Sequence, residues 1–332
     1  MPLFNRRHML QGLGLSTLAA IGNRGLQAAP PAARQKAQIA ITLDLEMSRH
    51  YPTRQMTEWD YQKGNLDGPT KEYSLKAAQL TAERGALIHF FCVGRVLEQP
   101  DISWLQQIAK LGHPVGNHTY DHVNVHARTL EAVQFRFKRS PWLANGRTPM
   151  QVIRDNIRIT NIGLKERAEI VANGFRTPGG FHDGLKDRPD IQDMLLDQGF
   201  TWVSSLYPRH KSGETMKPPT ADVYEDIVAT QSKAQPFLYP SGLLEIPMSP
   251  ISDITGFRTR FWKLDYFLKA IRLAVEWTIE NRAVFDLLCH PSCLVVEDPE
   301  FKTINMICDL VKEAGDRAEI VGLDTIARPY LK

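Results

Sequence analysis

Short apolar runs alternate with longer segments of helical periodicity along most of the chain. The runs are rich in β-branched and aromatic residues, which is typical of buried strands. The predicted strands cover residues 38–43, 86–93, 114–117, 174–176, 201–204, 243–246, 284–289 and 319–321. The predicted helices cover residues 73–84, 102–111, 150–172, 190–198, 264–281 and 298–314. This alternation favours an α/β protein with a mainly parallel sheet.

Polar side chains follow several of the predicted strands. Asp44 comes after the first strand, His118 after the third, Thr177 after the fourth and His290 after the penultimate one. In a closed parallel barrel, catalytic residues gather at the carboxyl ends of the strands. We therefore expect these side chains to meet at one end of a barrel.

The composition is that of an ordinary globular protein with a large core, with 332 residues of which 43% are hydrophobic and 23% charged. The formal charge of +3 comes from the N-terminus, where Arg6, Arg7 and Arg24 stand among residues 1–28 without an acidic residue. Without these arginines the remainder is neutral. The sequence therefore does not support nucleic-acid binding, which calls for a clustered basic face.

The N-terminal segment has the layout of an export signal. Residues 5–11, Asn-Arg-Arg-His-Met-Leu-Gln, resemble the twin-arginine consensus. The apolar run at 13–21 is too short to span a membrane, and an Ala/Pro-rich stretch follows at 28–33. The sequence predicts an export signal and linker over residues 1–36, a catalytic domain over 37–332, and a periplasmic or extracellular location. A simple basic tail is the alternative that composition leaves open.

Two histidines, His118 and His122, stand four residues apart in a polar segment that begins with Gly116. On a helix or helical turn, positions i and i+4 share one face, so two imidazole nitrogens can converge on one divalent metal. Glu46 would add a carboxylate, and three protein ligands with one open position are typical of a catalytic zinc site. Such a donor set also accepts cobalt, nickel or manganese.

Five short motifs occur in order between residue 39 and the C-terminus. They are Thr42-Leu43-Asp44-Leu45-Glu46, His89-Phe90-Phe91-Cys92-Val93-Gly94, His118-Thr119-Tyr120-Asp121-His122, Phe175-Arg176-Thr177-Pro178-Gly179-Gly180 and Leu288-Cys289-His290. In this order and spacing the chain resembles the NodB-type polysaccharide deacetylases of carbohydrate esterase family 4. Residues 199–208 resemble the branch near allantoinase-like and exopolysaccharide-associated members. The resemblance implies a distorted (β/α)7 barrel with loop insertions.

The resemblance also implies how the metal and the attacking water are held. Glu46, His118 and His122 would bind the metal, with zinc as the expected ion. Asp44 would take a proton from the water, and Arg176 would keep Asp44 ionised and oriented.

The resemblance implies roles for two further residues after the water has attacked the acyl carbon. His290 would protonate the departing amine, and the backbone N–H of Gly179 would share the oxyanion with the metal. The implied reaction is hydrolytic removal of an N-acetyl or O-acetyl group from a cell-envelope or extracellular polysaccharide.

Two departures from the family pattern leave alternatives open. Leu45 separates Asp44 from Glu46, whereas most relatives have two adjacent aspartates, so Asp44 could be the ligand with no base remaining. Val203 stands where this branch often has Asp, and the sequence does not identify the partner that would orient His290. The same departures keep a catalytically degenerate carbohydrate-binding protein as one alternative function. Hydrolysis of a small cyclic amide, as by allantoinase-like relatives, is the other.

The four cysteines are too few for a disulfide scaffold and lack zinc-ribbon spacing. Cys92 and Cys289 each end an apolar run, which predicts buried free thiols. A disulfide between Cys289 and Cys293 is compatible with export but not required by the sequence. The sequence does not define an oligomeric state.

Overall fold

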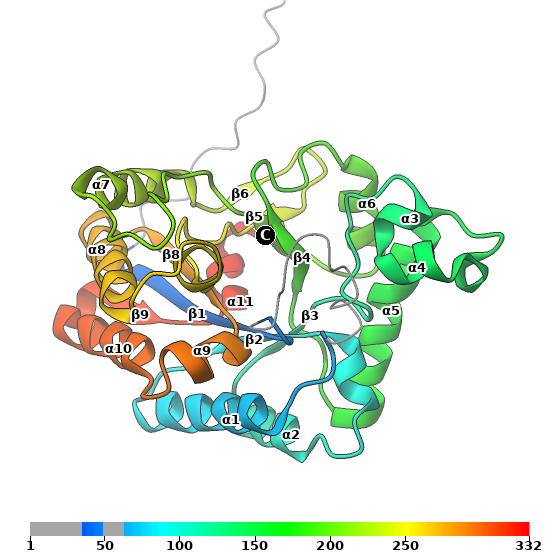
Figure 1. Ribbon diagram of the computed structural model, residues 1–332, viewed down its shortest axis with the longest axis horizontal. Coiled ribbons are helices and arrows are strands. Elements are labelled where there is room, and N and C mark those ends of the chain that lie inside the picture. The colour runs from blue at the N-terminus through cyan, green and yellow to red at the C-terminus, as the bar shows by residue number, and fades with distance from the viewer. Residues whose placement is uncertain (1–34, 49–62, 332) are drawn as a thin grey trace, which may run out of the picture.

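The computed structural model describes residues 35–48 and 63–331 (Figure 1). Residues 1–34 of the predicted export signal lie outside this range. The strands are β1 (Ala37–Leu45), β2 (His89–Cys92), β3 (Val115–Asn117), β4 (Phe175–Phe181), β5 (Trp202–Leu206), β6 (Phe237–Leu238), β7 (Leu244–Glu245), β8 (Val284–Cys289) and β9 (Ala318–Ile320).

The helices surround the strands in Figure 1. They are α1 (Gly68–Glu83), α2 (Ser103–Lys110), α3 (Leu130–Val133), α4 (Phe135–Arg139), α5 (Pro149–Ala168), α6 (Pro189–Asp197), α7 (Ala221–Thr230), α8 (Leu264–Asn281), α9 (Pro291–Glu297), α10 (Lys302–Ala314) and α11 (Leu323–Ala327). A 3-10 turn, η2 (Gly94–Glu98), follows β2, and a π-helix, η5 (Ile254–Thr259), lies before α8. No helix in the described ranges combines the length and apolar character needed to cross a bilayer.

Seven strands run parallel in the spatial order β7-β5-β4-β3-β2-β1-β8. The short β6 pairs antiparallel with β7, and β9 pairs with β1. The segment after β7 reaches β8, because the Ser249 N–H donates to the carbonyl oxygen of Asp286 at 2.9 Å. The Asp286 N–H donates in turn to the Ser249 hydroxyl at 3.2 Å. The sheet thus curls into the distorted (β/α)7 barrel that the resemblance predicted.

Strand alternation separates an apolar outer face from a polar interior. On β1, Ile39, Ile41 and Leu43 belong to the core cluster that also contains side chains of α1, α8 and α10. The intervening Thr42 and Asp44 are also buried, and both reach the Arg176 guanidinium from β1. Sequence periodicity does not reveal this polar interior, because the strands are buried on both faces and read as continuous apolar runs.

Several element boundaries differ from the sequence-based prediction. α1 begins at Gly68, five residues before the predicted start, because the Asp67 side chain accepts a hydrogen bond from the Thr70 N–H at 2.9 Å and caps the helix. The predicted helices include neither α7 nor α9, and α9 begins directly after His290. α5 ends at Ala168 rather than 172, since Glu169 adopts a left-handed conformation.

All four cysteines are buried and free, as predicted for Cys92 and Cys289. Cys289 and Cys293 do not form a disulfide in the structure.

Gly174 precedes β4 at φ +76°, and a Cβ built there would lie 1.9 Å from the Trp202 ring at the start of β5. We expect Gly174→Ala to lower the free energy of unfolding by about 3 kcal/mol or more, because the substitution adds a steric clash to an unfavourable backbone conformation. Urea denaturation measures the change. Gly199→Ala is the matched control, because Gly199 has φ +86° but open space around it. Gly199→Ala should lower the free energy of unfolding by about 1 kcal/mol. Equal losses of stability in the two variants would show that the contact with Trp202 does not destabilise Gly174→Ala.

Candidate active site

Glu46, His118 and His122 form a metal-binding geometry at the carboxyl ends of β1 and β3. Their candidate ligand atoms all lie within 4.8 Å of one another. Glu46 Oε2 is 2.6 Å from His122 Nε2 and 3.6 Å from His118 Nε2. Ligand atoms around a tetrahedral zinc ion, each about 2.0–2.1 Å from the metal, lie roughly 3.3 Å apart. These residues therefore fit a divalent metal.

The two histidines do not lie on a helix, contrary to the simplest interpretation of their spacing. Residues 118–122 form a turn in which Thr119 (φ 59°) and His122 (φ 55°) have left-handed backbone. The Asn117 side chain accepts from the Thr119 N–H at 2.8 Å, and the Thr119 hydroxyl accepts from the Val123 N–H at 3.0 Å. Side-chain hydrogen bonds thus hold a strained turn that brings both imidazoles to one point.

Each imidazole presents a nitrogen to the candidate metal position. His118 Nδ1 donates to the carbonyl oxygen of Arg176 at 2.9 Å, so Nε2 is the nitrogen that faces Asp44 and Glu46. Burial lowers the pKa of His122 to about 4, so its ring is neutral at pH 7. Neutral imidazoles are the form that binds metals.

Lys63 also belongs to the site, although no sequence pattern predicted it. Its ammonium donates to Glu46 Oε1, and the two side chains are 3% and 2% exposed. Burial opposes ionisation of Glu46, whereas His122 and Lys63 favour it, and the pKa of the Glu46 carboxyl lies well below its usual value. The Lys63 ammonium thus places a buried positive charge directly on the Oε1 side of this carboxylate.

Arg176 lies fully buried inside the barrel and joins three strands. Its Nη1 donates to Asp44 Oδ1 on β1 at 3.2 Å, and its Nη2 donates to Asp286 Oδ2 on β8 at 2.5 Å. The guanidinium also stacks on the Phe91 ring of β2, 4.4 Å from the centroid. Burial raises the pKa of Asp286 above its usual value despite the arginine. Asp286 lies inside an apolar run, so no motif in the sequence marks it as a site residue.

His290 follows β8, and Asp253 holds it in place. The Asp253 carboxylate accepts from His290 Nδ1 at 2.9 Å and from the His290 backbone N–H at 2.8 Å. Burial opposes protonation of the imidazole, but Asp253 outweighs it and raises the pKa of His290. Asp253 is thus the orienting partner that the sequence left unidentified. Val203 packs in the outer core cluster and does not face the site.

Gly179 lies near the carboxyl end of β4 at φ +80° and lines a cleft of about 410 Å³ together with His122. The far wall of the cleft comes from the inserted segment that contains α3 and α4, including Gln134 and Lys138. This insertion is attached to the histidine turn, because Arg136 donates to Asp121 at 2.8 Å. A substrate can therefore approach the imidazoles along a surface of defined shape.

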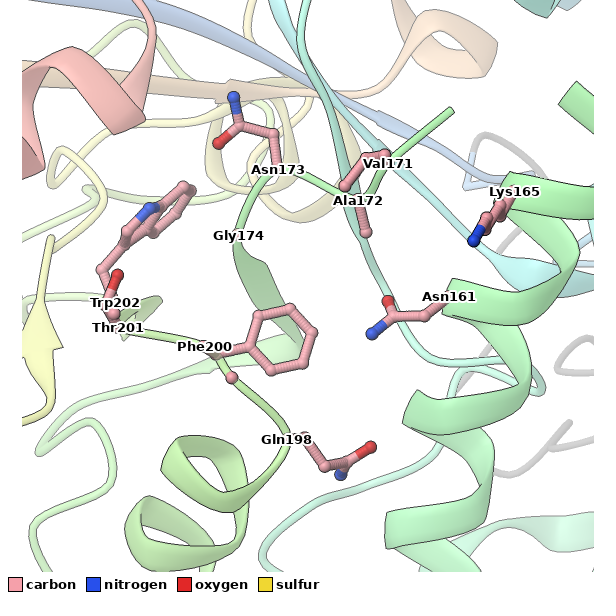
Figure 2. Close-up of a pocket in the computed structure, with 11 residues that line it drawn as sticks. Asn161, Lys165, Val171, Ala172, Asn173, Gly174, Gln198, Phe200, Thr201 and Trp202 are labelled. Atoms are coloured by element: carbon pink, nitrogen blue, oxygen red, sulfur yellow. The ribbon is translucent and has the colours of Figure 1, made fainter. Parts of the chain in front are cut away.

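A second pocket, of about 650 Å³, lies at the opposite, amino ends of β4 and β5. Figure 2 shows its lining side chains, which come from α5 and from the segments that precede the two strands. Amide and aromatic groups such as Asn161, Gln198 and Phe200 dominate it, and its lining residues include no Asp, Glu, His or Cys. Lys165 is its one titratable lining side chain, and no metal-binding side chain accompanies it, so the candidate active site remains at the carboxyl ends.

Residues 67–188 match the family model for polysaccharide deacetylases. This stretch of the chain is similar to the polysaccharide deacetylases. The matched stretch includes the histidine turn, Arg176 and Gly179, whereas Asp44, Glu46 and His290 lie outside it. The members of this family are hydrolases that act on N-acetyl amide bonds.

The chain is similar to a chitooligosaccharide deacetylase from Azorhizobium caulinodans, with 38% identity over 71 residues. This match spans 21% of the chain and only 33% of the length of that curated relative. Among solved structures, a probable polysaccharide deacetylase from Pseudomonas aeruginosa PAO1 has a TM-score of 0.59 at 13% identity, over 96% of this chain and 98% of that one. A putative polysaccharide deacetylase from Mycobacterium smegmatis has a TM-score of 0.57 at 16% identity, over 91% and 92% of the two chains. At these identities the structural matches establish the fold of the family.

Replacement of Asp253 by its neutral isostere should lower the pKa of His290. In Asp253→Asn the charge that favours the imidazolium is lost, and burial then favours the neutral ring. NMR titration of the imidazole resonances measures the change. Asp193→Asn removes an exposed carboxylate on α6 and serves as the control. An unchanged His290 pKa in Asp253→Asn would contradict the electrostatic role of Asp253.

Proposed function

We propose that this chain is a metal-dependent hydrolase that removes N-acetyl or O-acetyl groups from a cell-envelope or extracellular polysaccharide. The main support is the arrangement of an acid and a base on either side of the metal donors. Asp44 Oδ2 lies 3.7 Å from His118 Nε2, and His290 Nε2 lies 3.4 Å from Glu46 Oε1. This is the layout needed to take a proton from water on one side and deliver one to a leaving group on the other.

Asp44 acts as the base in this proposal. Its Oδ1 is bound by Arg176, which leaves Oδ2 directed toward His118 and available to accept the proton of the attacking water. Glu46 is the better ligand, because its Oε2 lies close to both imidazoles whereas Asp44 is already paired with the arginine. A divalent metal held by Glu46, His118 and His122 would polarise the acyl carbonyl and lower the pKa of water.

His290 acts as the acid. Its Nδ1 faces Asp253, so Nε2 is the nitrogen that carries the proton toward the site. As water adds to the acyl carbon and the C–N bond breaks, this proton goes to the departing amine, and acetate is the other product. The backbone N–H of Gly179, beside His122 in the cleft, would donate to the oxyanion.

Removal of a metal ligand and removal of the base should have different effects. We expect His118→Ala to lose the metal, and Asp44→Asn to keep about one metal ion per chain while its kcat falls by about 10²–10⁴-fold. Metal analysis of the purified protein and acetate release from a panel of N- and O-acetylated glycans provide the two measurements.

His182→Ala is the control for the first variant, because it removes an exposed imidazole and should leave the metal content unchanged. Loss of metal in Asp44→Asn would instead assign the ligand role to Asp44. Turnover of a small cyclic amide such as allantoin, without acetate release from glycans, would favour the allantoinase-like alternative. Glycan binding without metal or turnover would identify a degenerate binding protein.

We also propose that residues 1–36 direct export through the twin-arginine route, on the support of Arg6 and Arg7. Arg6→Lys combined with Arg7→Lys should retain the full chain in the cytoplasm, as measured by cell fractionation. Arg24→Lys, a change of the same chemistry outside the motif, should be exported normally. Export of the double variant would contradict this route.

A further inference from the structure

We propose that Lys63 is a built-in counter-ion of the metal site, which balances the charge of Glu46 in the metal-free protein and lowers the affinity for divalent metals. This inference rests on the metal site proposed above.

The two oxygens of the Glu46 carboxylate face different side chains. Its Oε2 faces the Nε2 atoms of His118 and His122, whereas its Oε1 accepts from the Lys63 ammonium and lies 3.4 Å from His290 Nε2. The lysine side chain is 3% exposed, so water screens its charge little. A divalent ion on the Oε2 side would therefore share one carboxylate with a buried positive charge.

The backbone delivers Lys63 to this position. The Lys63 carbonyl accepts from the Met47 N–H at 2.9 Å, directly after Glu46. The next residues are fixed to η2, because the Gln99 side chain donates to the carbonyl of Leu66 at 3.0 Å. At Gly64 a Cβ would lie 2.4 Å from Arg95 Cβ, so a residue without a side chain is needed for this close approach.

The backbone of Glu46 is held without the Lys63 side chain. The Glu46 N–H donates to the Asp44 carbonyl at 2.9 Å, and the Ser292 hydroxyl donates to the Glu46 carbonyl at 2.8 Å. Lys63 therefore contributes charge rather than placement. Removing that charge favours a divalent ion nearby, and it leaves a buried carboxylate uncompensated when the metal is absent.

The test compares Lys63→Gln, which keeps a hydrogen-bond donor, and Lys63→Met, which keeps the apolar stem, with the wild type. Each full-length protein is stripped with a chelator, and Zn²⁺ affinity is measured by competition with a chromophoric chelator. Thermal unfolding is followed with and without Zn²⁺. We expect both variants to bind Zn²⁺ at least ten-fold more tightly. Their metal-free Tm should fall, and their Tm should rise more on Zn²⁺ addition than that of the wild type.

Two further variants isolate the charge. Lys63→Arg keeps a cation and should stay within about three-fold of the wild-type affinity. Lys186→Met, which removes an exposed lysine after β4, should change neither quantity.

Equal or weaker Zn²⁺ affinity in Lys63→Gln and Lys63→Met would overturn the inference while leaving the proposed function intact. Variants that fold only with Zn²⁺ would support it, whereas variants that fail to fold under both conditions would show a structural role instead. If the wild type itself binds no Zn²⁺, the proposed metal site fails and the inference fails with it.

Discussion

The buried guanidinium of Arg176 is the constraint on which the rest of the site depends. A fully buried cation is tolerated only when it is paired and hydrogen-bonded, and here two carboxylates, two hydroxyl groups and an aromatic face surround it. Because these partners come from β1, β2, β5 and β8, the arginine fixes the relative positions of strands on both sides of the barrel. The same contacts orient Asp44, and the Arg176 carbonyl orients His118.

The site contains two pairs of oppositely charged groups. In one pair, the Arg176 guanidinium donates to Asp44. In the other, Asp253 favours the protonated form of His290. The side chains of both pairs are buried, so water screens their charges little, and His290 Nε2 lies 3.4 Å from Glu46 Oε1. Such buried charges act strongly on a group held beside Glu46.

The wall of the cleft and the charged side chains of the site come from different parts of the chain. The strands and their immediate ends supply the reacting groups, whereas the insertion with α3 and α4 forms the wall of the adjoining cleft. The insertion is attached to the histidine turn through Asp121 and Arg136, so the cleft has a fixed relation to the imidazoles. The shape of the cleft can therefore change with the insertion while the groups at the strand ends stay in place.

The sequence by itself determined the alternation of strands and helices, the mainly parallel sheet and the residues at the strand ends, because periodicity and local motifs are local properties of the chain. The closed barrel followed from the family resemblance. The sequence named Asp44, Glu46, His118, His122, Arg176, Gly179 and His290 as candidates. Only the tertiary structure revealed Lys63, Asp253 and Asp286. Each lies far along the chain from most of the groups that surround the site, in a loop, a turn or an apolar run with no motif of its own. Their importance arises from burial beside charges on other strands, and that proximity exists only after the sheet has curled into a barrel.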